Sequence, residues 1–143
     1  MAALYDRYAG LFLHTNAAFL CERAHAEAPS SQTLEARASC YLRQGAAHRA
    51  YATLRGQTLE PHGRYLLALA CQRLDKDAEA EAALLPDRAA RAAGPRESAQ
   101  LLRSKASPVP HGAAGLYVLG SICEKGNRAS HAIAYYELAL EKD

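Results

Sequence analysis

A chain of 143 residues is long enough for one domain or one short repeat array, and two independent domains are not expected. Half of its residues are apolar, with two Phe and no Trp, a composition that suits closely packed helices better than a β-sandwich. Seventeen basic and fifteen acidic residues leave a net charge of +2, which excludes the concentrated positive field typical of nucleic-acid and membrane-surface binding.

The first segment, residues 2–13, carries only two charges and is apolar nearly all round. That pattern predicts a helix that is buried on every side. The next segment has Ala17-x3-Cys21-x2-Ala24 and then Pro29, which cannot continue a helix. We therefore expect a second helix that packs through small residues and ends before this proline.

Residues 31–57 contain a second arrangement of this kind, in which a turn at Gly45 separates two helical segments. The first of these carries Leu34, Ala38 and Tyr41 at packing positions, and the second carries Ala50 and Leu54. Arg37 occupies a position where the pattern predicts an apolar residue, and a buried charge is costly without a partner. Either its long side chain reaches solvent or the helix is rotated locally.

Residues 61–86 repeat the scheme, with Leu67, Ala68 and Cys71 before a turn at Asp75, and Ala80 and Leu84 after it. The stretch 86–110 then interrupts the series with four prolines and five basic residues. We expect an inserted, solvated and mobile loop there. Ser107-Pro108 within it is a minimal proline-directed phosphorylation motif that is too short to carry a prediction.

The last block, residues 113–143, identifies the repeat. It reads Leu116-x2-Leu119-Gly120-x2-Cys123 and then Ala132-x3-Tyr136-x2-Ala139, which follows the tetratricopeptide pattern W-x2-L-G-x2-Y followed by A-x3-F. Small residues are required where the two helices of a unit cross closely, and Asn127 supplies the turn between them.

The period of the alanines supports this assignment. Ala17, Ala50, Ala80 and Ala132 are separated by 33, 30 and 52 residues, against a standard period of about 34. Only the last interval is too long, and its excess matches the stretch 86–110. We predict an all-α, right-handed tetratricopeptide superhelix of antiparallel helix pairs, with about four repeats over residues 1–143.

Neither end of this array has the polar capping face that repeat proteins need. Residues 2–13 are apolar, and Ile133, Tyr136 and Leu140 in the last helix still lack a neighbouring helix. We expect the chain to be an N-terminal piece of a longer protein, and a second copy to cover its apolar start, since two-fold association is the commonest oligomeric form. The predicted interface residues are Leu4, Tyr5, Tyr8, Leu11, Phe12, Phe19, Leu20 and Tyr51.

Several segments also resemble a particular family. Five segments are similar to the N-terminal region of the cell-division-cycle protein 27 family, the tetratricopeptide subunits of the anaphase-promoting complex (cyclosome). They are Asn16–Arg23, Cys40–Gly45, Ala50–Gly56, Arg64–Cys71 and Gly112–Gly120. Two motifs are more specific than the generic repeat, because repeat packing does not require them. They are Ala50-Tyr-x-x-Leu-x-Gly56 and Arg64-Tyr-Leu-Leu-Ala68. The start Gly112-Ala-Ala-Gly115 looks like the plant and algal members.

The resemblance implies a homodimerising, non-catalytic scaffold in a ubiquitin ligase of the cell cycle, with other subunits of that complex as partners and a location in the nucleus and cytoplasm. The alternative is a monomeric tetratricopeptide adaptor that binds a partner peptide in its concave groove. The helix positions that would need a basic clamp for an acidic C-terminal peptide hold Ala and Leu instead.

The sequence offers little catalytic or metal chemistry. Its four cysteines form no CxxC pair and fit a reducing, intracellular compartment. Cys21 and His25 could share a helix face, but Cys21 sits at a packing position, where small apolar behaviour is the commoner role. Tyr41, Tyr117 and Tyr136 fall at or beside packing positions and are expected in the core. We expect no enzyme activity, no cofactor, no metal and no small-molecule substrate.

Overall fold

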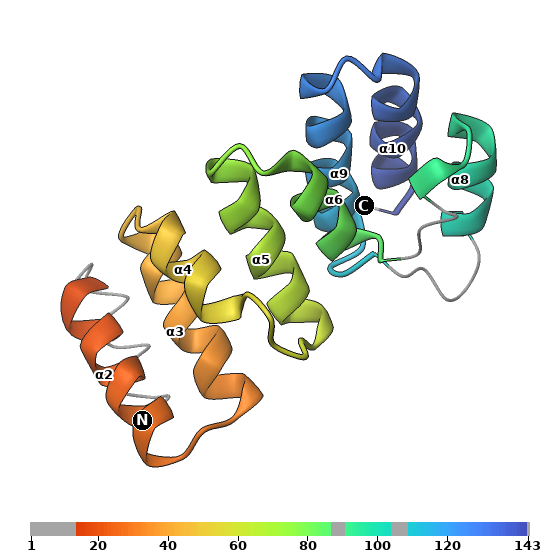
Figure 1. The fold of residues 1–143 in the computed structure, drawn as a ribbon. Helices are drawn as coiled ribbons and strands as arrows, with labels where there is room; N and C mark the ends of the chain where they lie inside the picture. Colours follow the sequence, from red (N-terminus) through yellow and green to blue (C-terminus); the bar gives the residue numbers. More distant parts are fainter. Residues whose placement is uncertain (1–13, 87–90, 104–108, 143) are drawn as a thin grey trace.

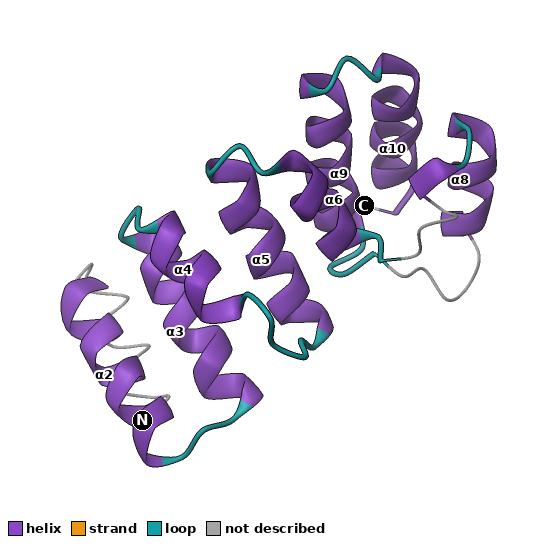
Figure 2. Cartoon of the chain, viewed as in Figure 1, coloured by secondary structure: helices purple, strands orange, loops and turns teal. Residues whose placement is uncertain are grey.

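The structure of the protein is a computed structural model that describes residues 14–86, 91–103 and 109–142 (Figure 1). Regular structure in these ranges is helical, without strands (Figure 2). The predicted helix over residues 2–13 lies outside the described residues. The helices whose bounds are described are α2 His14–Glu27, α3 Ser31–Arg43, α4 Ala47–Leu54, α5 Pro61–Arg73, α6 Asp77–Leu84, α8 Pro95–Arg103, α9 Ala113–Lys125 and α10 Ala129–Lys142.

Consecutive helices form antiparallel pairs, α3 with α4, α5 with α6 and α9 with α10, and the pairs follow one another through the described chain (Figure 1). The turns inside the three pairs share one geometry. Gly45, Asp75 and Asn127 have φ values of 79°, 60° and 60°, the left-handed region that Gly, Asp and Asn tolerate best. These are the three turn positions that the sequence predicts, and all three are confirmed.

One hydrogen bond closes each of these turns in the same way. In each turn, the residue that follows the left-handed residue donates its backbone N–H to the carbonyl oxygen of the residue five positions earlier in the chain. The three bonds are 2.8 Å long and join Ala46 to Tyr41, Lys76 to Cys71, and Arg128 to Cys123. The repeat found in the sequence is therefore also a repeat of the backbone hydrogen bonding, and the tetratricopeptide-type fold of antiparallel helical pairs is confirmed.

The small residues lie where the pattern places them. The alanines Ala17, Ala50, Ala80 and Ala132 are all buried. Gly120 also serves close packing, because a Cβ built on it would lie 2.7 Å from the ring of Tyr136 in the paired helix. A larger side chain at these positions would push the helices of a pair apart.

The core of the described chain consists of two clusters that meet at α5. Leu66 and Ala70 of α5 pack in the N-terminal cluster with residues of α2, α3 and α4. Ala68 and Cys71, on another face of the same helix, pack in the C-terminal cluster with α6, α9 and α10. Since α5 is shared, the stacking of neighbouring repeats, rather than any single pair, buries its surface.

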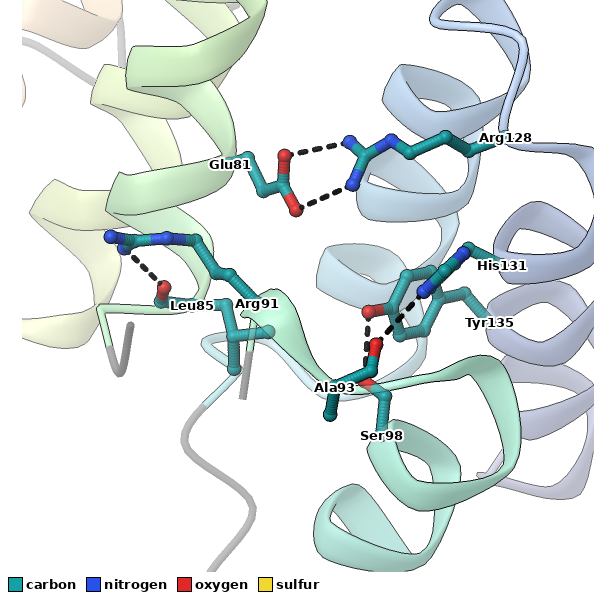
Figure 3. A network of polar contacts seen from close by, with 8 residues as sticks. All are labelled: Glu81, Leu85, Arg91, Ala93, Ser98, Arg128, His131 and Tyr135. Atoms are coloured by element: carbon teal, nitrogen blue, oxygen red, sulfur yellow. Dashed lines mark hydrogen bonds and ion pairs between the residues drawn. The ribbon is translucent and has the colours of Figure 1, made fainter. Parts of the chain in front are cut away.

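The stretch 86–110 differs from the expected mobile loop. Its residues Pro95–Arg103 form α8, which packs against α10. Ser98 of α8 is fully buried, and its hydroxyl lies 2.8 Å from that of Tyr135 in α10 (Figure 3). Proline and arginine made the stretch look solvated, but Pro95 is the first residue of the helix, where its missing N–H costs nothing.

Further polar contacts fasten this segment to the repeats (Figure 3). A ring nitrogen of His131 in α10 lies 3.0 Å from the carbonyl oxygen of Ala93, and Arg91 donates to that of Leu85 at 2.8 Å. At the end of α8, Arg103 forms an ion pair with Glu141 at 2.9 Å. Most of these contacts join residues nearly 40 positions apart, so no local pattern in the sequence predicts them.

Two of the expected tyrosine placements hold, and one is wrong. Tyr41 is fully buried and Tyr136 is partly buried against the C-terminal cluster. Tyr117 is 64% exposed, and its ring lies 5.4 Å from that of Tyr136. Tyr135 takes the core position in this part of α10. Adjacent residues point to different faces of a helix, so Tyr135 packs inside the C-terminal cluster while Tyr136 packs against its edge.

Candidate interaction surfaces

Five of the eight predicted interface residues lie outside the described residues, namely Leu4, Tyr5, Tyr8, Leu11 and Phe12. The structure describes the other three. Phe19 lies on α2 and is 58% exposed, although its neighbours Ala17, Ala18 and Cys21 are buried. Leu20 is half-buried. Helix α2 thus packs one face against α3 and presents a large apolar side chain on another face.

Tyr51 has a different environment. Its ring packs against both core clusters, and its hydroxyl donates to Glu79 of α6 at 2.6 Å. Lys76 and Arg55 lie over the ring at 5.2 and 5.7 Å. Tyr51 therefore joins two neighbouring repeats of this chain, and its part in a dimer contact stays a prediction.

A second exposed apolar surface lies on the last helix pair. Tyr117, Ile133 and Leu140 of α9 and α10 are 64%, 58% and 75% exposed. Two of them, Tyr117 and Leu140, line a groove of about 590 Å³ together with Ala113, Ala114, Glu124, Tyr136 and Ala139. Ile133 and Leu140 are two of the three residues predicted to lack a neighbouring helix, and their exposure agrees with that prediction.

Comparison of equivalent positions explains this exposure. Tyr51, Glu81 and Ile133 each follow one of the repeat alanines, Ala50, Ala80 or Ala132. Tyr51 and Glu81 contact the following repeat, Tyr51 through its ring and Glu81 through two hydrogen bonds of 3.1 and 2.7 Å to Arg128. No further repeat is described after α10, so Ile133 is exposed.

The Glu81–Arg128 pair was not predicted from the sequence. Glu81 is buried to 9% exposure, and both of its carboxylate oxygens accept from the Arg128 guanidinium (Figure 3). A carboxylate this deep needs such a partner, and the bidentate fork supplies it. The bond to Glu81 raises the pKa of Arg128 further. The two residues are 47 positions apart, so only the repeat register could have suggested the contact.

The Cys21–His25 pair does not come together as a site. Cys21 lies in the N-terminal cluster with its sulfur 3.5 Å from that of Cys40, while His25 Nδ1 lies 2.8 Å from the Thr33 hydroxyl. Within the described ranges, no group of three or more His, Cys, Asp and Glu is placed to hold a metal ion. Burial raises the pKa of Cys71 and that of Cys123 to about 11, which keeps both thiols protonated.

The helices of the described ranges are also too short or too polar to cross a membrane. What the described residues offer is interaction surface, both apolar and charged.

Comparisons with known proteins identify the family to which this helical repeat is similar. The family model described as anaphase-promoting complex, cyclosome, subunit 3 matches residues 11–86. Over 132 residues, 92% of the chain, it is 40% identical to cell division cycle protein 27 homolog A of Arabidopsis thaliana and 36% identical to homolog B. It is 42% identical to cell division cycle protein 27 homolog of Homo sapiens over 71 residues, 49% of the chain. The chain spans 16% of the length of the Arabidopsis relatives and 9% of the human one.

Proposed function

The chain belongs to the anaphase-promoting complex, cyclosome, subunit 3 family, and we propose that it is a non-catalytic, self-associating scaffold segment of such a subunit. The match to the Arabidopsis relatives along 92% of the chain carries this proposal. The architecture supports it, because stacked helix pairs present extended surfaces to other proteins. Ubiquitin ligation in the cell cycle and a location in the nucleus and cytoplasm are parts of the same proposal.

Self-association rests on the apolar residues at the start of the chain. Residues 2–13 carry two charges among largely apolar side chains, and Phe19 of α2 is exposed. Large apolar side chains that the chain itself does not cover mark an interaction site. A second copy would cover it symmetrically, with the same residues contributed by both chains.

The test measures whether the chain binds one of its Arabidopsis relatives in cells. The chain is expressed with an affinity tag in Arabidopsis cells, beside a Leu11→Asp, Phe12→Asp variant, and both are precipitated. We expect wild type to recover cell division cycle protein 27 homolog A, and the variant to recover at least fivefold less of it. Equal recovery of homolog A by the two chains would refute the apolar interface. If wild type recovers neither homolog A nor other subunits of the complex, the scaffold proposal is refuted.

A further inference from the structure

A pocket of about 380 Å³ lies between α2, α3 and α4. Helix α3 contacts both α2 and α4, and the three helices follow one another at the N-terminal end of the described chain (Figure 1). We refer to it as the arginine pocket. It is lined by His25, Leu34, Arg37, Tyr41, Arg49, Ala52, Thr53 and Gln57. Arg37 is the residue whose charge the repeat pattern could not explain.

Tyr41 contacts both arginines of this pocket. The guanidinium carbons of Arg37 and Arg49 lie 5.7 and 4.6 Å from the centroid of its ring. Arg37 Nε also donates to the Tyr41 hydroxyl at 3.1 Å, and that hydroxyl donates to Glu22. Because Tyr41 is fully buried, its ring gives both arginine side chains a fixed contact, which reduces the entropy that they would lose on binding.

The charges in this cluster do not balance. Glu22 is the one carboxylate that contacts it among the described residues, and its ion pair with Arg49 is long, at 3.5 Å. Arg49 contacts Glu22 directly and Arg37 only through the Tyr41 hydroxyl, so the cluster holds two guanidinium groups and one carboxylate. A surplus positive charge held between three helices is more favourable when an anion lies beside it.

Hydrogen-bond donors also remain available. A guanidinium group has five N–H donors. In the described part of the chain, Arg37 uses its Nε–H on Tyr41, and Arg49 uses one amino group on Glu22. The planar fork formed by the remaining donors matches the oxygens of a carboxylate or a phosphate.

We propose that the arginine pocket binds the carboxylate or phosphate of an acidic segment in a partner protein. Nucleic acids and anionic membranes need several cationic contacts, and a chain with a net charge of +2 and one local surplus charge does not supply them. An acidic peptide needs only one such anchor beside its backbone contacts.

The experiment titrates the isotopically labelled chain with three hexapeptides that differ at one central residue, which is Glu, phosphoserine or Gln. The readouts are the NMR signals of the Arg37 and Arg49 Nε–H groups and of the Thr53 amide. We expect the Glu or the phosphoserine peptide to shift these signals, and the stronger of the two identifies the anion as carboxylate or phosphate. Equal shifts with the Gln peptide, or no shift with any peptide, would overturn the proposal.

Variants separate this pocket from general surface charge. Arg37→Gln and Arg49→Gln should each weaken binding of the stronger peptide at least fivefold. Arg23→Gln removes an exposed arginine of α2 that pairs with Glu27 outside the pocket, and it should change binding less than twofold. Equal weakening by all three would overturn the proposal. Circular dichroism shows whether each variant is folded, and Arg49, with an exposed side chain, gives a second test if Arg37→Gln unfolds.

The outcome is independent of the scaffold proposal. The pocket lies on α2, α3 and α4, and the predicted self-association rests mainly on residues 2–13. Loss of peptide binding in Arg37→Gln with an unchanged molecular mass in solution would support the pocket alone, whereas a monomeric wild type that still binds the peptide would leave the pocket standing.

Discussion

Arg128 and Glu81 form the most buried ion pair among the described residues, since their side chains are 37% and 12% exposed. Arg128→Ala would leave the Glu81 carboxylate without its bidentate partner, and the cost of leaving a buried charge unpaired exceeds that of losing a surface pair. We expect the free energy of unfolding to fall by about 1–3 kcal/mol, measured by urea denaturation.

The matched control is Arg103→Ala, which removes an arginine from a pair with Glu141 whose two side chains are both 52% exposed. Surface pairs contribute at most about 1 kcal/mol. The interpretation of the buried pair would be wrong if the two variants lost the same stability.

Gly115 lies in the first turn of α9, where the chain at Val109 and Pro110 crosses it. A Cβ at this position would overlap the carbonyl oxygen of Pro110 and lie 2.7 Å from a methyl group of Val109. Gly115→Ala should therefore lower the free energy of unfolding by about 1–3 kcal/mol. Gly94→Ala is the control, because nothing lies within 4 Å of its Cβ; a midpoint of denaturation that is the same in both variants would contradict the close packing.

The buried thiols predict how stability depends on pH. The pKa of Cys71 and that of Cys123 are about 11, raised above 9.0 mainly by burial. Above pH 9 the unfolded thiols lose protons that the folded chain retains, so the unfolded state is favoured as pH rises. We expect these thiols to leave the free energy of unfolding unchanged below pH 9 and to lower it between pH 9 and 11, so that a Cys71→Ala, Cys123→Ala variant loses stability less steeply in that range. Parallel curves would show that these thiols are not the cause.

At the scale of elements, α8 depends on one buried hydroxyl pair. Ser98→Ala leaves the hydroxyl of Tyr135 without that partner, and an unsatisfied buried group costs about 1–3 kcal/mol. Tyr135→Phe should cost a similar amount, but the double variant should be less destabilised than the sum, because both polar groups are then gone. Additive losses in thermal unfolding would show that the two hydroxyls do not interact.

The helix pairs could be predicted because their signals are local. Gly45, Asp75 and Asn127 adopt left-handed φ angles as their chemistry allows, and the spaced alanines follow from close helix crossing. Helix α8 could not be predicted in this way, since it is held by Tyr135 and His131 from another element. The exposure of Tyr117 on α9, whose ring lies against that of Tyr136 on α10, likewise depends on how two helices pack and not on a local pattern.

At the scale of the whole molecule, the sequence indicated an interaction protein but could not show how its surface is charged. The predicted interface residues are apolar or aromatic, and Phe19 among them has the exposure that an interface role needs. The arginine pocket was missed, because Arg37, Tyr41 and Arg49 lie on two helices and only folding brings them together with Glu22. A repeat pattern predicts which residues pack, and charged clusters on its surface follow from the three-dimensional arrangement.

The central proposal, a self-associating scaffold, is tested most directly by the mass of the purified chain in solution. Light scattering at several concentrations compares wild type with the Leu11→Asp, Phe12→Asp variant, and circular dichroism checks that helicity is kept. We expect wild type at twice the chain mass of 15.4 kDa and the variant at the mass of one chain. A wild type that stays monomeric at high micromolar concentration would contradict the proposal and favour a monomeric adaptor.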